Sequence, residues 1–342
     1  MDNDKKKIGV YQTGEYGAFL FEKKLHKILL KKKLDEQFQI VRVTPRDVAH
    51  ADFLNDLAGL AMPGRNSGQQ YRDEWGEQGY KNLKTAVEQS GMNILAVCAA
   101  SAVLCREVSW YNSFQPAKDN KYVYNEHALF NGKAIGAFDN LWRDGYRSVM
   151  KNTRCDEYHS NILAAKVLPV QFAKPLIGDG MGGIDGHALY WGGCVFYRDF
   201  KSDKPRILVQ HQHQHLPTKT VLSIPVLTEN NKDIALSRIE PKPFLNPEAV
   251  IEFDVGKGQV IFSNIHPEID SEDFAYLFHT TPQARNDKNE LSDLFLQDKN
   301  KMVQSDIYNS LIFERFVENC TGLRQTSLVQ TVKKAKKELA AS

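Results

Sequence analysis

The chain has 342 residues, enough to bury one large core or one core plus an appendage. Its 42% of hydrophobic and 25% of charged residues are typical of a soluble globular protein. Its formal net charge of +2 neither indicates nor excludes a nucleic-acid partner. Aromatic residues are not interleaved among the lysine clusters, one of which includes Lys23, Lys24 and Lys27. We therefore interpret the clusters as solvated helix faces or frayed ends, and expect no nucleic-acid partner.

Short apolar runs alternate with amphipathic stretches over the first hundred residues. Strands are predicted over residues 7–11, 38–43, 57–62 and 94–97, and helices over 18–34 and 77–89, with Gly91 ending the second helix. Such alternation is typical of a parallel sheet with helices on both faces. In sheets of this kind, functional sites gather at the carboxyl ends of the strands.

Beyond about residue 108 the long helical patterns stop and the chain is predicted to be mainly antiparallel β-structure. Short strands are predicted over residues 134–138, 167–170, 188–191, 194–197, 206–209 and 220–224. Residues 249–255 and 259–264 flank Gly256–Lys257–Gly258 and predict a hairpin.

The last part of the chain returns to helical patterns. Helices are predicted over 291–296 and 307–317, followed by a basic tail. We expect one domain over residues 1–270 and a helical extension over 271–342. The apolar helices of this extension either cap the sheet or form the surface of a homo-oligomer.

Cys98 ends the apolar run 94–97, and small residues in a helix-compatible pattern follow it at once. A nucleophile at a sharp turn from strand to helix is the elbow arrangement of α/β hydrolases. The start of a helix also favours the thiolate form of a cysteine. The alternative is that Cys98 is a small core residue, because free cysteines are among the most buried side chains.

Two further segments carry groups that a thiol nucleophile needs. His266 and Glu268 follow the predicted hairpin, and extended backbone around Pro267 would place both side chains on one side, as a base and the group that orients it. The Pro63–Gly64–Arg65 loop could direct N–H groups at an oxyanion, together with the N–H of Ala99. Taken alone, the His266–Glu268 segment is better explained as a surface loop, and the Pro63–Gly64–Arg65 segment fits an ordinary turn equally well.

Together these segments resemble a known family, the amidotransferase-like domain at the N-terminus of biotin–protein ligases, within the class I glutamine amidotransferase-like superfamily. The resemblance covers about residues 7–270. It rests on Tyr11 with Gly14, Met62–Pro63–Gly64 with Tyr71, Cys98–Ala99–Ala100, Tyr190–Trp191–Gly192–Gly193–Cys194–Val195–Phe196, Gly256–Lys257–Gly258–Gln259–Val260 and His266–Pro267–Glu268. The biotinyl-adenylate loop of the ligases is absent, so a full ligase is not expected.

The resemblance implies a flavodoxin-like, doubly wound, mostly parallel sheet with antiparallel additions. It also implies a Cys98–His266–Glu268 triad. The residues implied for the oxyanion hole and substrate site are Gly64, Arg65, Ala99, Tyr71, Gly192 and Gly193.

The chain departs from the family at Arg65, Ala96 and Ala100, where glycines are usual. Arg65 would be strained if its position required a positive φ, and its side chain could fill the pocket. Alternatively, Arg65 could bind the carboxylate of an acidic substrate. Both readings stay open at this point.

The five cysteines are odd in number and lack CxxC spacing, which fits a reducing compartment and gives no zinc framework. His211, His213 and His215 could share one face of a strand, but an exposed polar strand end explains them better than a metal site. No apolar window reaches the length of a membrane span. We expect a cytoplasmic protein without a metal, cofactor or membrane partner.

Two hypotheses on function follow. The first is a hydrolase with a cysteine nucleophile that acts on an amide or similar acyl bond of a small molecule or peptide. The second is a catalytically silent module of the same fold that binds a metabolite or a protein.

Overall fold

The structure is a computed structural model. It describes residues 5–14, 16–65, 68–110, 121–136, 165–177, 183–191, 194–198, 205–212, 222–227, 234–239, 248–280 and 290–322.

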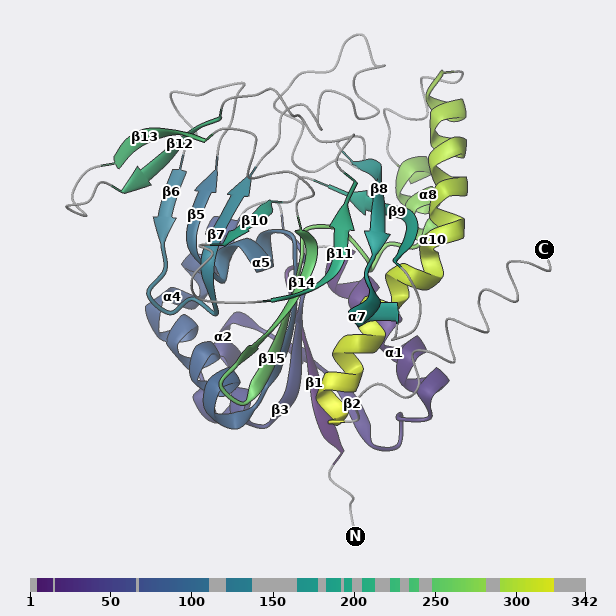
Figure 1. The fold of residues 1–342 in the computed structure, drawn as a ribbon. Helices are drawn as coiled ribbons and strands as arrows, with labels where there is room; N and C mark the ends of the chain where they lie inside the picture. Colours follow the sequence, from purple (N-terminus) through teal and green to yellow (C-terminus); the bar gives the residue numbers. More distant parts are fainter. Residues whose placement is uncertain are drawn as a thin grey trace.

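A nine-stranded sheet runs through the centre of the fold (Figure 1). Its strands are β1 (Lys6–Tyr11), β2 (Phe38–Val43), β3 (Leu57–Met62), β4 (Asn93–Val97), β8 (Lys166–Phe172), β9 (Ile184–Tyr190), β11 (Arg206–His211), β14 (Glu248–Val255) and β15 (Gly258–Ser263). They lie in the order β2-β1-β3-β4-β15-β14-β11-β8-β9. The strands from β2 to β15 in this order are parallel, and every later neighbour is antiparallel.

Two smaller sheets accompany the large one. A four-stranded sheet has the order β10-β7-β5-β6, and β12 and β13 form a separate antiparallel pair. Their bounds are β5 (Cys105–Trp110), β6 (Lys121–Tyr124), β7 (Phe130–Gly136), β10 (Val195–Arg198), β12 (Leu222–Leu227) and β13 (Ile234–Ile239).

The local predictions for strands are largely confirmed. The strands predicted over 38–43 and 57–62 coincide with β2 and β3, and the predicted hairpin is β14 and β15. Gly256 in its turn has φ 57, and a Cβ there would lie 2.4 Å from the carbonyl oxygen of Glu88, so the turn needs glycine. The sequence did not predict that β15 would also pair in parallel with β4. That pairing joins segments far apart in the chain, so a local sequence pattern does not predict it.

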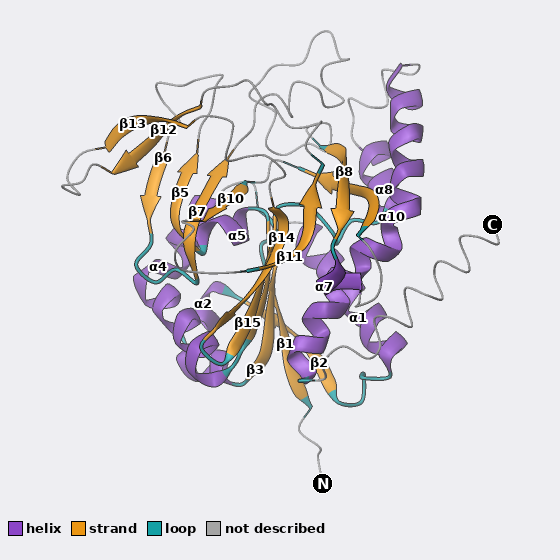
Figure 2. Cartoon of the chain, viewed as in Figure 1, coloured by secondary structure: helices purple, strands orange, loops and turns teal. Residues whose placement is uncertain are grey.

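Helices cover both faces of the parallel strands (Figure 2). Leu95 and Val97 of β4 share a core with α1 (Tyr16–Lys32) and α10 (Glu290–Thr321). Ile94 and Ala96 face the other way, toward α4 (Gly68–Thr85) and α5 (Ala99–Val103). The shorter helices are α2 (Pro45–Val48), α3 (Ala51–Asn55), α7 (Lys174–Ile177) and α8 (Ser271–Thr280). The fold is therefore a mixed α/β fold with a two-sided parallel half.

The helix predicted over 77–89 begins earlier, at Gly68, and ends as a π-helical turn over Ala86–Ser90 before Gly91 at φ 79. Gly76 interrupts it with φ 55. Glycines and polar residues argue locally against a helix here. Buried Tyr71 and Trp75 offset that tendency, because they pack against the sheet.

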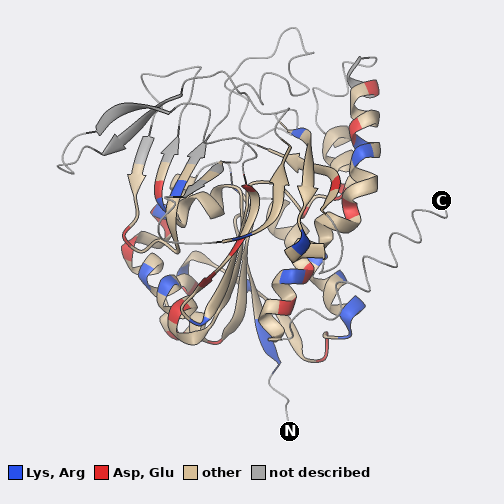
Figure 3. Cartoon of the chain, viewed as in Figure 1, with Lys and Arg blue, Asp and Glu red and all other residues tan. Residues whose placement is uncertain are grey.

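The two helices predicted near the C-terminus form the single helix α10, which packs on the sheet. A Cβ at Gly59 of β3 would lie 2.4 Å from Cys320 Sγ, so this glycine lets α10 approach closely. Figure 3 shows acidic and basic residues interspersed along α10 rather than separated by sign. Among the helices described, none is both long and apolar enough to cross a membrane.

A buried ion pair joins α10 to β14. Arg315 donates from Nε and Nη2 to the two carboxylate oxygens of Glu252, at 2.9 Å each, and Glu252 is fully buried. Arg206 donates to the same carboxylate at 2.9 Å. Burial opposes the charge of Glu252, but these arginines and Asn319 lower its pKa below the usual value.

Arg315→Met should lower the free energy of unfolding by about 3 kcal/mol, because it leaves a buried carboxylate with a missing partner. Urea unfolding at neutral pH measures the change. Arg42→Met is the matched control, because Arg42 pairs with Glu22 but its side chain is 72% exposed. Equal stability of the two variants would contradict the assigned role of Arg315.

Candidate active site

Cys98 forms the turn between β4 and α5. Its backbone has φ 55 and ψ −120, and Lys33 is the one other non-glycine residue of the described chain with positive φ. Such a conformation costs about 1–3 kcal/mol and persists where surrounding contacts enforce it. Here Cys98 N donates to Ser263 O at 2.7 Å, and Ser101 Oγ donates to Cys98 O at 2.6 Å. The structure thus has the sharp strand-to-helix turn that the sequence predicts.

The register of the parallel strands brings the predicted residues to one edge. Val97 at the end of β4 pairs with Ser263 at the end of β15, and Ala96 pairs with Met62 at the end of β3. The segments that follow these strands therefore leave the sheet side by side. They carry Cys98, His266 with Glu268, and Gly64.

His266 and Glu268 form a buried pair. His266 Nδ1 lies 2.7 Å from Glu268 Oε1, and the two residues are 8% and 3% exposed. Burial by itself lowers the pKa of His266. The Glu268 carboxylate and the Cys98 side chain outweigh burial and raise this pKa well above the usual histidine value. When His266 is protonated, its Nδ1–H donates to Glu268.

Gly64 packs directly against both Cys98 and His266. A Cβ at this position would lie 3.0 Å from Cys98 Cβ, 3.2 Å from His266 Cε1 and 3.6 Å from Cys98 Sγ. Tyr71, also predicted as a site residue, is fully buried, and its hydroxyl donates to Pro63 O at 2.5 Å. Tyr71 thus stabilises the Pro63–Gly64–Arg65 loop through this hydrogen bond, and its hydroxyl is not directed at the thiol.

The carbonyl of Trp191 is a site group that the sequence did not indicate. Its oxygen lies 3.7 Å from Cys98 Sγ and 3.3 Å from His266 Nε2. The Trp191 ring lies 5.8 Å from the imidazole ring. The resemblance included Trp191 in a motif, but a backbone oxygen leaves no side-chain pattern to detect. Gly192 and Gly193, which follow it, lie outside the described residues.

Arg65 is engaged by its own chain. Its Nη1 lies 2.5 Å from Glu74 Oε2, its Nη2 donates to Thr13 O at 3.3 Å, and its guanidinium lies 5.1 Å from the Tyr71 ring centroid. Arg65 is not among the positive-φ residues, so its position does not require glycine. Its carboxylate partner here is Glu74, which also accepts from Tyr11.

Ala99, predicted to donate its N–H to an oxyanion, is the first residue of α5 and is 9% exposed. The N–H groups of the first helical turn have no partner within a helix. The N–H of Ala99 therefore belongs to the turn that carries the thiol.

Among the residues that the structure describes, no group of three or more His, Cys, Asp or Glu side chains is arranged to hold a metal ion. His211 is buried, with Nε2 3.0 Å from Asn264 Oδ1, and burial lowers its pKa to about 4. It is therefore a neutral core residue and not an exposed strand end. His213 and His215 lie outside the described residues.

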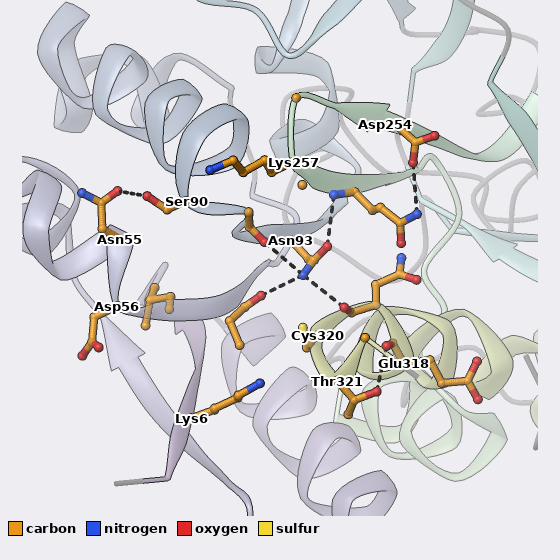
Figure 4. A pocket seen from close by; sticks show the side chains of 18 residues that line it. Lys6, Asn55, Asp56, Ser90, Asn93, Asp254, Lys257, Glu318, Cys320 and Thr321 are labelled. Atoms are coloured by element: carbon orange, nitrogen blue, oxygen red, sulfur yellow. Dashed lines mark hydrogen bonds between the residues drawn. The ribbon is translucent and has the colours of Figure 1, made fainter. Parts of the chain in front are cut away.

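A cavity of about 770 Å³ lies at the opposite edge of the sheet, near the amino ends of the parallel strands (Figure 4). At its centre, Asn93 Nδ2 donates to Ala58 O at 2.9 Å and Asn319 O at 3.3 Å, and Asn93 Oδ1 accepts from Gln259 N at 3.0 Å. Cys98 and His266 do not line this cavity. The polar groups there join strands to α10 and are separate from the thiol site.

The chain is similar to several solved structures. A glutamine amidotransferase is 14% identical over 86% of this chain and 98% of its own, with a TM-score of 0.38. A ThuA-like protein from Bacteroides uniformis is 11% identical over 88% and 91%, with a TM-score of 0.41. Another from Parabacteroides merdae is 12% identical over 93% and 90%, with a TM-score of 0.40.

No protein-family model and no curated protein matches the chain. The similarities to solved structures are too distant to bear on the chain's activity. The resemblance to the biotin–protein ligase domain stays a prediction.

Glu268→Gln should lower the pH at which His266 titrates by about 1–2 units, because it removes the adjacent negative charge. Titration of ¹⁵N-labelled histidines by NMR, with His266→Ala to assign the signal, measures this change. Glu272→Gln is the control, since Glu272 is exposed at the start of α8. An unchanged midpoint in Glu268→Gln would mean that the pair does not interact in solution.

Proposed function

We propose that this protein is a hydrolase with a cysteine nucleophile that cleaves an amide or similar acyl bond. The observation that carries the proposal is the His266–Glu268 contact of 2.7 Å at the sheet edge where Cys98 forms a positive-φ turn. A thiol, an imidazole and a carboxylate in this arrangement are the parts of a nucleophilic triad.

In the first half of the reaction, Cys98 Sγ attacks the carbonyl carbon of the substrate. Its proton goes to His266 Nε2, and Glu268 stabilises the imidazolium through Nδ1–H. The carbonyl oxygen of the tetrahedral intermediate accepts from the N–H of Ala99 and from the Gly64–Arg65 loop. His266 then returns the proton to the leaving amine, the C–N bond breaks, and a thioester on Cys98 remains.

In the second half, water attacks the thioester. His266 takes a proton from the water, the C–S bond breaks, and the released thiolate is protonated by His266. The acid product leaves and the starting state is restored. Gly64 contributes by being small, because a side chain there would occupy the space between the thiol and the imidazole.

The resemblance described above supports amide chemistry and a place in the class I glutamine amidotransferase-like superfamily. Within it, the N-terminal domain family of biotin–protein ligases is the proposed relative. The substrate class proposed is a small-molecule or peptide amide, processed in the cytoplasm without a bound cofactor. The arginine and alanines at positions 65, 96 and 100 set this chain apart from the usual glycines of the family.

One observation favours the second candidate, a catalytically silent binding module. Cys98 is 7% exposed, and the Trp191 carbonyl contacts both the thiol and the imidazole. The thiol is thus nearly buried and lies next to the Trp191 carbonyl. The two candidates therefore differ in whether a small electrophile reaches Cys98.

Iodoacetamide at neutral pH should modify Cys98 at least about tenfold faster than the other cysteines, and His266→Ala should abolish this selectivity. Peptide mass spectrometry over a time course measures each site. Cys105, Cys194 and Cys320 are internal controls, because burial raises the pKa of each of these thiols.

Equal, slow modification of all cysteines would favour the silent module. If Cys98 is selective, metabolite profiling of a Cys98→Ser strain against wild type should show accumulation of the amide substrate.

A further inference from the structure

The Pro63–Gly64–Arg65 loop is held by the side chain of its own arginine. The side chain of Arg65 is 7% exposed, and its Nη1 lies 2.5 Å from Glu74 Oε2. Its Nη2 donates to Thr13 O at 3.3 Å, and the guanidinium lies 5.1 Å from the centroid of the Tyr71 ring. Arg65 therefore contacts both the segment that follows β1 and the first part of α4.

Glu74, the partner of Arg65, is itself held by Tyr11 at the end of β1. The Tyr11 hydroxyl donates to the same oxygen, Glu74 Oε2, at 2.5 Å, and Tyr11 is fully buried. Burial opposes the charge of Glu74, but hydrogen bonds from Arg65 and Tyr11 hold the pKa of Glu74 below its usual value. Glu74 is therefore a carboxylate at neutral pH, and hydrogen bonds to a charged group are stronger than those between neutral groups.

Tyr71 and Glu74 belong to a short helical segment at the start of α4. Gly76, with φ 55 and ψ −171, interrupts the helix immediately after this segment, so the segment relies on its own side-chain contacts for its position. The ring of Trp75 meets the ring of Tyr11 edge-on, with centroids 5.5 Å apart, and the Tyr71 hydroxyl donates to the loop. The segment thus connects β1 with the loop, and the Arg65 ion pair is part of this connection.

The same loop touches the candidate nucleophile and base. A Cβ on Gly64 would lie 3.0 Å from Cys98 Cβ and 3.2 Å from His266 Cε1. Arg65 directly follows Gly64, so the contacts of the Arg65 side chain constrain the loop backbone relative to both groups. An oxyanion donor acts only within hydrogen-bond distance of the developing charge, so a small shift of the loop weakens it.

We propose that Arg65 is a positioning residue, whose ion pair with Glu74 holds the Gly64 backbone in the place where it faces a substrate oxyanion. The partner of this arginine is thus a carboxylate of its own chain and not one of the substrate. The catalytic part of the inference rests on the proposed hydrolase function. The mechanical part, in which the ion pair keeps the loop in place, does not depend on it.

Hydrogen–deuterium exchange, followed by mass spectrometry, tests whether the ion pair holds the loop. In Arg65→Met and in Glu74→Ala, the amides of the peptide that contains Gly64 should exchange about tenfold faster, because a charge-assisted hydrogen bond is lost. Arg65→Lys keeps the charge and should restore part of the protection. Arg42→Met is the matched control, because Arg42 also pairs with a glutamate but is 72% exposed, and the variant should leave exchange of the loop unchanged.

A second measurement separates the oxyanion from the nucleophile. With p-nitrophenyl acetate, the Cys98 thiolate attacks the acetyl carbon, p-nitrophenolate leaves through an oxyanion intermediate, and a thioester forms. Alkylation by iodoacetamide has no oxyanion. Arg65→Met should slow acylation of Cys98 about tenfold and change its alkylation less than about twofold. Release of p-nitrophenolate, corrected with Cys98→Ala, measures the first rate, and peptide mass spectrometry measures the second.

Unchanged exchange of the loop in folded Arg65→Met overturns the inference, as does an acylation rate that falls no more than the alkylation rate. If Arg65→Met does not fold, Glu74→Ala replaces it, since the side chain of Glu74 is 29% exposed. A wild-type Cys98 that reacts with neither reagent contradicts the hydrolase, and exchange of the loop then decides the inference on Arg65 alone.

Discussion

The parallel pairing of β4 with β15 is the constraint on which the rest of the site depends. It aligns Val97 with Ser263, and the ladder continues one residue further, where Cys98 N donates to Ser263 O at 2.7 Å. The sheet therefore fixes the start of the thiol turn and the start of the His266 segment with the same hydrogen bonds. Since β3 pairs with β4 on the other side, the Gly64 loop is brought to the same edge. Small residues and short loops then determine how closely the groups approach.

Two buried carboxylates of this fold have a basic side chain as partner. Glu252 in the sheet pairs with Arg315 of α10, and Glu268 at the site pairs with His266. A buried charge without a partner lowers the stability of the fold, and a partner of opposite charge offsets this cost. The helix α10 contributes to both regions, because Arg315 pairs with Glu252 of β14 and Asp306 accepts from Ser271, which lies three residues after Glu268. The C-terminal helix thus belongs to the core that supports the site.

Local structure could be predicted from the sequence where a local pattern of residues determined it. The strands at 38–43 and 57–62 and the hairpin turn at Gly256 follow from β-branched runs and from a glycine that only a positive φ explains. Features that depend on contacts with segments far away in the chain could not be predicted from the sequence. Examples are the start of α4 at Gly68 and the burial of Lys24. Cys98, His266 and Glu268 were candidates because of their chemistry and chain order. The Trp191 carbonyl was not, because backbone groups carry no residue signature.

The central claim is that the thiol of Cys98 and the imidazole of His266 are neighbours in solution. The most direct measurement is reaction with 1,3-dibromoacetone, which loses two bromides as it forms one C–S and one C–N bond and so bridges adjacent thiol and imidazole groups. Peptide mass spectrometry should find the Cys98 peptide joined to the His266 peptide through this bridge. A product in which Cys98 carries the reagent but His266 stays unmodified would contradict the account.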